Sequence, residues 1–143
     1  MNDMTLDKAT EFKVKASEII AMIERLEHWR ENILEGLERG GGGYTFDDVL
    51  ERCVNGVFRV YFWDDAYMII QLAEYPQCRH YHVFLAGGNM ETLIAAVPQL
   101  KRDAKDAGCQ RLALNGRMGW WRVYRDRLPV KPYLTLTMEL DDG

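Results

Sequence analysis

The sequence lacks the features that would assign it at once to a membrane or secreted class. No uninterrupted apolar run in its 143 residues approaches the roughly 20 residues that a membrane-spanning helix needs. The first stretch, MNDMTLDKATEFKVK, has neither the apolar core nor the small-residue cleavage site of a secretory signal. We therefore expect a protein made inside the cell, with no membrane span.

Cysteine is scarce, and the sequence has neither a CxxC nor an HExxH motif. The three cysteines, Cys53, Cys78 and Cys109, are odd in number and widely spaced. Without an export signal, this favours buried reduced thiols over a disulfide framework. Cys78, His80 and His82 would share one face of a strand, which is a spacing that could hold zinc. Because no further ligand motif accompanies them, covering the sheet edge is the simpler role, and we predict no metal site.

A surface dominated by one sign of charge is also missing. The formal net charge is −4, and acidic and basic residues are interleaved along the chain. The exception is a basic stretch from Arg111 to Lys131, but Asp126 and Glu139 lie close to it in sequence. Non-specific nucleic-acid binding needs a clustered basic surface. We therefore favour a neutralised surface, and nucleic acid is not a favoured partner.

The composition, by contrast, is that of a domain with a buried core. Hydrophobic residues make up 48% of the chain and charged residues 28%, which is typical of a single globular domain of this length. Apolar residues that recur at spacings of four and three, from Phe12 to Leu37, predict a helix over about residues 7–38. Such a helix would be about 45 Å long, against an expected radius of gyration of about 14–15 Å. We expect it either to break or to overhang the domain at its first turns.

The rest of the chain alternates β-rich runs with helical runs. Four glycines end the first helix, Thr45 is suited to cap a second one, and Asn55-Gly56 is suited to stop it. Pro98 should kink a third helix, and a short fourth helix contains two adjacent tryptophans. The expected strands cover residues 57–63, 66–73, 79–86, 109–115 and 133–140.

This order predicts an α/β fold with a mixed, mostly antiparallel sheet flanked by helices and a long N-terminal helix. We divide the chain into an N-terminal helical segment over residues 1–39 and an α/β domain over residues 44–143. The N-terminal segment would contact a partner or cover the sheet. No internal repeat and, apart from the four glycines, no low-complexity segment is present.

One part of the sequence resembles a known family. The order of elements resembles that of the GNAT superfamily of N-acetyltransferases, from the first two helices to the penultimate strand. More specifically, GGNMETL and AKDAGCQRLALNGRMGWWRVYRD look like segments of small GNAT-like proteins encoded by tailed bacteriophages. Those proteins carry Gly-Cys before the strand and Gly-Arg-x-Gly-Trp after it. The resemblance covers about residues 45–140 and is specific over residues 108–121.

The resemblance implies a place for acetyl-CoA. In GNAT folds, the amides of a glycine-containing loop bind the pyrophosphate of this cofactor at a helix N-terminus. The corresponding residues here would be Ala86, Gly87, Gly88 and Asn89. The glycine pair is shorter than the usual loop, and Glu91 lies in the first turn of the helix, where its carboxylate would repel a diphosphate. We therefore expect no cofactor, and acetyl-CoA only if the protein is an enzyme.

The resemblance also implies residues for catalysis. The asparagine that commonly ends the next strand would be Asn115, and the tyrosine that protonates the departing thiolate in many members would be Tyr124. Glu74, at the end of a predicted strand, could act as a general base. The simpler interpretations are packing for Tyr124 and a solvated turn position for Glu74.

The adjacent tryptophans Trp120 and Trp121 suggest a contact surface. Neighbouring residues of a helix diverge by about 100°, so one ring should cap the sheet and the other should lie at the rim, unless both pack against the N-terminal helix. Exposed aromatic and arginine side chains are enriched at interaction hot spots. The predicted interface residues are Phe12, Ile19, Ile23, Arg117, Trp120 and Trp121.

Two functions follow from these observations. The first is a non-catalytic GNAT-like structural or accessory protein of a tailed phage virion, in the head, portal or tail region or as an ejected protein. It would act through contacts with other phage structural proteins or with its own copies, first in the host cytoplasm and then in the virion. The alternative is an acetyl-CoA-dependent N-acetyltransferase that acts on an amine of a protein or small molecule. The shortened loop and the excess of apolar surface favour the first.

Overall fold

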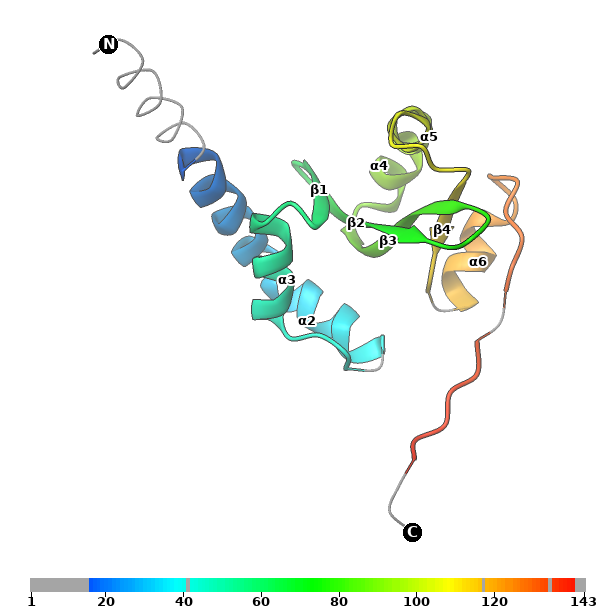
Figure 1. The fold of residues 1–143 in the computed structure, drawn as a ribbon, viewed down its shortest axis with the longest axis horizontal. Helices are drawn as coiled ribbons and strands as arrows, with labels where there is room; N and C mark the ends of the chain where they lie inside the picture. Colours follow the sequence, from blue (N-terminus) through cyan, green and yellow to red (C-terminus); the bar gives the residue numbers. More distant parts are fainter. Residues whose placement is uncertain (1–15, 41, 117, 134, 141–143) are drawn as a thin grey trace.

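The structure, a computed structural model, describes residues 16–40, 42–116, 118–133 and 135–140 (Figure 1). It has a mixed α/β fold in which helices flank an open sheet, as the sequence predicts. In chain order the elements are a helix over residues 16–28, α2 (Arg30–Arg39), α3 (Phe46–Val54), β1 (Phe58–Trp63), β2 (Ala66–Glu74), β3 (Arg79–Gly88), α4 (Met90–Ala95), α5 (Val97–Asp106), β4 (Arg111–Leu114) and α6 (Met118–Tyr124).

The sheet follows the chain, with the strand order β1-β2-β3-β4. β1, β2 and β3 pair antiparallel, and the Asp64-Asp65 turn joins the first two strands as expected. β4 then pairs parallel with the first part of β3, from His80 to Val83. The sheet is therefore mixed and mostly antiparallel, because only its last pair of strands is parallel.

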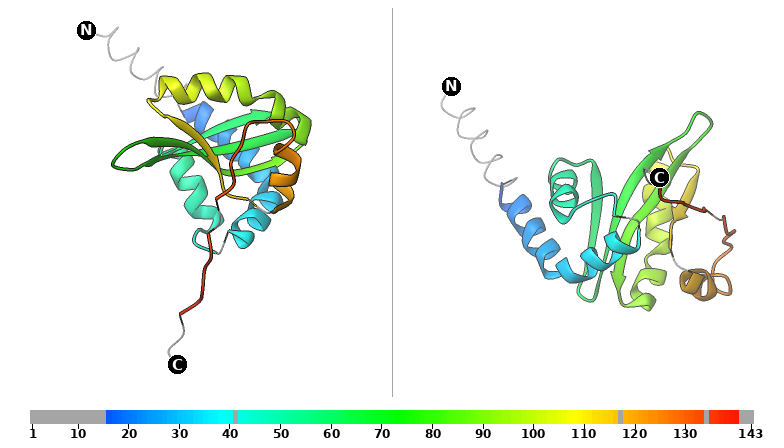
Figure 2. Two further views of the ribbon diagram at one scale, coloured as in Figure 1. Left: turned by 90° about the vertical axis from the view of Figure 1, so that its right-hand side faces the viewer. Right: turned by 90° about the horizontal axis from the view of Figure 1, so that it is seen from below.

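The helices divide between the two faces of the sheet (Figure 2). The helix over residues 16–28, α2 and α3 cover one face, where Leu26, Ile33 and Val49 are fully buried with Tyr67. The N-terminal helical segment is thus a sheet cover over its described part. At 25 cal/mol or so per Å² of apolar surface, this burial is a main source of stability.

The other face is covered by the helices that follow β3. Leu93 of α4 and Leu100 of α5 are buried against Met68 and Tyr81 of the sheet, and Trp120 of α6 packs at the margin of this cluster. Both faces of the two central strands are therefore buried. This explains why β2 reads as a nearly continuous apolar run rather than as an alternating one.

The long N-terminal helix breaks at Trp29. This residue separates the helix over residues 16–28 from α2 and has the non-helical ψ of 11°. Its ring packs against that of Tyr67, with 5.1 Å between the centroids. The break confirms one of the two outcomes expected from the length of the helix. Residues 7–15 lie outside the described residues, and an overhang there stays a prediction.

Local capping signals are confirmed in the next helices. The side chain of Thr45 accepts a hydrogen bond from the amide of Asp48 (3.1 Å), whose carboxylate accepts one from the Thr45 amide (2.8 Å). This reciprocal pair is a capping box. Pro98 lies in the first turn of α5, and Ala96 separates α5 from α4. The predicted kink is therefore a full break into two helices.

The fifth predicted strand is wrong. Residues 133 and 135–140 form no strand in this structure, and this segment runs away from the sheet (Figure 1). The chain turns after α6, where the amide of Leu128 donates to the carbonyl of Tyr124 (2.9 Å). A strand exists only where a neighbouring backbone accepts its hydrogen bonds, and the turn leads this segment away from β4.

Gly88, at the end of β3, lies very close to the backbone of the turn between β1 and β2. Gly88 has φ +99°, and a Cβ there would lie 2.2 Å from the carbonyl oxygen of Asp65. Gly56 has a similar φ of +75° but open space around it. Gly56→Ala should cost about 1 kcal/mol of unfolding free energy, from its φ alone. Gly88→Ala should cost about 3 kcal/mol or more, since backbone must move. Equal losses in chemical denaturation would contradict the close approach.

Candidate functional site

The candidate site lies where the two parallel strands separate. β3 and β4 pair only as far as Val83 and Leu114, and the chain then leaves β4 through Asn115 into α6. The β2–β3 register shifts at Ile69 and Ile70, which leaves Phe84 as an extra residue. Such bulges redirect a strand. In open α/β sheets, the place beyond the carboxyl ends of parallel strands that diverge is where ligands commonly bind.

The glycine pair at this place is used for packing. A Cβ on Gly87 would lie 2.1 Å from Oδ1 of Asn32, a residue of α2 that accepts a hydrogen bond from Tyr67 (2.8 Å). Gly88 lies against the carbonyl of Asp65, as described above. The amide of Asn89 donates to that same carbonyl (2.8 Å). These contacts take up the loop that the family resemblance assigned to a pyrophosphate, while Ala86 packs at the margin of the core behind it.

The N-terminus of α4 is also closed by its own residues. Oδ1 of Asn89 accepts hydrogen bonds from the amides of Glu91 (2.9 Å) and Thr92 (3.4 Å). The hydroxyl of Thr92 donates to the carboxylate of Asp65 (2.9 Å). An anion at this helix end would have to displace Asn89 and would meet a carboxylate nearby.

Glu91, which the sequence presents as an unpaired carboxylate, has a partner in the structure. Arg127 donates two hydrogen bonds to its carboxylate, at 2.6 and 2.9 Å. This pairing holds the pKa of Glu91 below its usual value. Both side chains are exposed, so the pair itself adds little stability. Its effect is to remove most of the repulsion expected from Glu91, which leaves Asp65 as the carboxylate that opposes an anion.

Tyr124 and Trp120 lie together on α6. Their rings stack with 5.8 Å between centroids, and burial raises the pKa of Tyr124. A Cβ on Gly116 would lie 3.2 Å from the indole of Trp120, so this glycine admits the ring close to the turn that follows β4. Gly116 does not have a positive φ. Its role is therefore space and not backbone conformation.

The two tryptophans have different surroundings. Trp120 packs against the core on the α5 side of the sheet. Trp121 is half-buried, and the guanidinium of Arg125 lies 5.2 Å above its ring. Trp29 packs with the core on the opposite face of the sheet. Arg117 and Phe12 lie outside the described residues.

Glu74 lies far from the glycine pair. It ends β2 and pairs with Arg79, the first residue of β3, both in the strand register and through an ion pair. Gly87 is eight positions further along β3, which is about 26 Å at 3.3 Å per residue. The structure therefore does not bring Glu74 to the loop of Gly87 and Gly88.

Asn115 contacts a residue that the sequence analysis had considered for a different role. Its side chain lies near His82 of β3. Burial, followed by the neighbouring His80, lowers the pKa of His82, and the Asn115 side chain opposes this. Asn115 thus lies beside β3 at the point where the strands separate. His82 and Asn115 belong to neighbouring segments of the parallel β3–β4 pair, and no local sequence pattern indicates that they lie close together.

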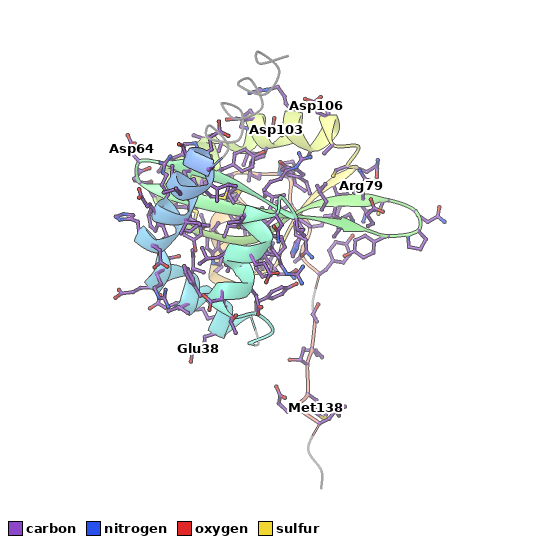
Figure 3. All side chains as sticks on the ribbon, turned by 60° about the vertical axis from the view of Figure 1, so that its left-hand side comes forward. Glu38, Asp64, Arg79, Asp103, Asp106 and Met138 are labelled. Atoms are coloured by element: carbon purple, nitrogen blue, oxygen red, sulfur yellow. The ribbon has the colours of Figure 1, made fainter. Side chains whose placement is uncertain are left out.

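A partly buried polar network joins β1, β3 and α5. The hydroxyls of Tyr61 and Tyr81 are 2.5 Å apart, and Tyr61 donates to Oδ2 of Asp103 (2.6 Å). Because the Tyr61 hydroxyl donates its proton to the bond with Asp103, Tyr81 is the donor in the bond between the two tyrosines. Burial and these bonds raise the pKa of Tyr61. Figure 3 shows Asp103 on α5, over the sheet. No local sequence pattern indicates this network, because its members are 20 and 42 residues apart.

The remaining features offer little room for a ligand. Across the described ranges, no group of three His, Cys, Asp or Glu residues is placed to hold a metal ion. Within the same part of the chain, no helix is long and apolar enough to cross a membrane. A cavity of about 120 Å³ is small beside the roughly 300–1,000 Å³ of ligand pockets. It is lined by Gly36, Leu37, Gly40, Gly43, Tyr44, Phe84 and Leu85.

The lowered pKa of His82 predicts a pH-dependent stability. The unfolded chain binds this proton near the ordinary pKa of 6.5, and the folded chain binds it only at lower pH. Stability contributed by neutral His82 is therefore present above pH 6.5 and is lost as the pH falls through the folded-state pKa. Thermal melts between pH 7.5 and 5 should show a smaller fall in Tm for His82→Gln than for the wild type. Parallel curves would show that His82 does not cause the dependence.

Comparisons with known proteins give a fold and no family. No protein-family model matches the sequence, and no curated protein matches it significantly. A crystal structure of a point mutant of TTHA1254 from Thermus thermophilus is similar, with a TM-score of 0.51 and 17% sequence identity. The match covers 79% of this chain and 95% of that one. The described part of this chain thus shares its overall α/β arrangement with a solved structure.

Proposed function

We propose that this protein is a non-catalytic, GNAT-like structural or accessory protein of a tailed phage virion. It acts through contacts with other virion proteins, in the head, portal or tail region or as an ejected protein. The observation that carries the non-catalytic part is the closed loop at the end of β3. There, the backbone of Gly88 and the amide of Asn89 are both held against Asp65.

Acetyl-CoA would need several amides that converge on its pyrophosphate. In this loop the amide of Asn89 is bonded to a carbonyl, and those of Glu91 and Thr92 are bonded to the Asn89 side chain. Freeing all three would cost about 0.5–1.5 kcal/mol each before any phosphate bond formed. The carboxylate of Asp65, bonded to Thr92, would then face the anion. The loop residues therefore fit their internal partners and do not fit a diphosphate.

Exposed apolar residues support a role in protein contacts. Ile20 on the first described helix, Leu34 on α2, and Val57 and Tyr75 at the ends of strands are all exposed. Ile19 and Ile23, which the sequence analysis assigned to an interface, are half-buried on the same helix as Ile20. These side chains are available for contact with a further protein.

The alternative is an acetyl-CoA-dependent N-acetyltransferase, and one observation favours it. Tyr124 follows Asn115 at the place where β3 and β4 separate, and its pKa is raised by burial. A tyrosine hydroxyl is protonated at neutral pH and can serve as a general acid, and the raised pKa makes Tyr124 a weaker one. The same tyrosine stacks on Trp120 in a packed arrangement, so packing accounts for it equally well.

Acetyl-CoA binding separates these proposals. A site with a Kd of about 10 μM would add roughly 2.7 kcal/mol of stability at 1 mM ligand. We expect no rise in Tm at 1 mM acetyl-CoA, and no thiol release across a panel of amines. Asn89→Gly removes the side chain that caps the amides of Glu91 and Thr92. It tests whether this side chain alone prevents acetyl-CoA from binding. Turnover within about 1–1,000 per second that is lost in Tyr124→Phe would establish the alternative.

The virion part of the proposal has its own test. Mass spectrometry of purified phage particles should detect this chain at a fixed ratio to the head or tail proteins. Cross-linking should then place its contacts on the first described helix and on the surface around Trp121. Ile20→Asp should reduce incorporation. Glu18→Gln, which is also exposed on this helix but lies about 160° around it from Ile20, should not. Absence of the chain from the particles would overturn this part.

A further inference from the structure

The outer edge of β4 is open. β4 is the last strand of the sheet and, among the described residues, pairs only with β3. Leu112 and Leu114 point to the same face of the sheet as Tyr81 and Val83, with which they are in register. They remain 36% and 37% exposed, although they continue a buried apolar face. An unprotected strand edge beside apolar side chains is a template for another strand.

A segment of the same chain has the pattern of the missing strand. Residues 135–140 run away from the domain, and Met138 lies well beyond the sheet (Figure 3). Leu136, Met138 and Leu140 are 83%, 85% and 92% exposed, and they alternate with Thr135, Thr137 and Glu139. Strict alternation with β-branched residues is typical of a strand that buries one face. Folded domains rarely leave such a row of large apolar groups in water.

We propose that residues 135–140 of one copy pair antiparallel with β4 of a second copy, and that the second copy returns the same contact. The register places Leu136 opposite Leu114 and Met138 opposite Leu112. Four leucine and methionine side chains then close the apolar face beside Tyr81 in each half of the dimer. A twofold exchange of identical segments is a common route to a closed dimer.

Charge selects this direction and register. Arg111 points to the face of β4 opposite to Leu112, and Glu139 points to the face of its segment opposite to Met138. The antiparallel register that pairs the apolar residues also places Glu139 directly opposite Arg111. A parallel register that aligned Leu136 with Leu112 would place Glu139 opposite Asn115 and leave Arg111 facing Thr135. Only the antiparallel arrangement satisfies both faces.

The second copy, and not the same chain, is the occupant because of where the segment goes. The turn after α6 directs residues 135–140 away from their own β4 (Figures 1 and 2). This inference goes beyond the proposed function, since it concerns two copies of this chain and holds whether or not a virion protein binds. It also gives the open edge and the exposed segment a single explanation.

The first measurement is the association state of the full chain by sedimentation equilibrium. We expect a monomer–dimer equilibrium in the wild type. Met138→Asp should raise the dimer dissociation constant by roughly a hundredfold, because two buried side chains are lost per dimer. Thr137→Asp, on the opposite face of the same segment, should change it by less than about threefold. A wild type that is monomeric at all concentrations, or equal effects of the two variants, would overturn the proposal.

The second measurement distinguishes a second copy from the same chain. Arg111→Glu and Glu139→Arg alone should each weaken the dimer by roughly tenfold, as like charges then face each other twice per dimer. Mixing the two variants should restore dimerisation, because in the mixed dimer every acidic residue meets a basic one. Pairing within one chain predicts no recovery on mixing. Each variant is altered at an exposed side chain, and circular dichroism should confirm that it is folded. Failure of the mixed variants to recover dimerisation would overturn the proposal.

Discussion

The contact between the backbone of Gly88 and the carbonyl of Asp65 decides much of this structure. It fixes the turn of the first hairpin against the end of β3, and the amide of Asn89 strengthens it by donating to the same carbonyl. From there α4 begins with its cap already made, and α2 can approach β3 because Gly87 has no side chain. The same contact closes the loop that an acetyltransferase would need open. The turn of the first hairpin and the start of α4 therefore both depend on one close approach.

Elements with strong local signals could be predicted from the sequence. Thr45 with Asp48 is a capping box within four residues, Pro98 prevents a continuous helix, and Asp64-Asp65 separates two β-rich runs. In each case the interaction that decides the structure lies within a few residues of the signal. The boundaries of the first three strands were close to those observed for this reason, and β4 is shorter than predicted because its pairing with β3 ends early.

Features that depend on distant residues could not be predicted. Arg127 pairs with Glu91 from 36 positions away, and Asp103 accepts a hydrogen bond from Tyr61, 42 positions away. Nothing near Tyr61 in the sequence indicates such a partner. The strand expected over residues 133–140 shows a second limit of prediction from a local pattern. Its pattern was correct for a strand, but a pattern does not say which edge will accept it. The GNAT and phage assignments likewise stay predictions.

The network of Tyr61, Tyr81 and Asp103 has a consequence for how the domain opens. It ties α5 to the first and third strands through groups that would be costly to bury without partners. α5 therefore cannot detach by itself, and amide protons on β1, β3 and α5 should exchange together in one cooperative unit. Residues 135–140, which form no strand with the sheet, are outside this unit. They can change conformation at the cost of a local opening, so the margin of the domain can exchange partners while the sheet stays folded.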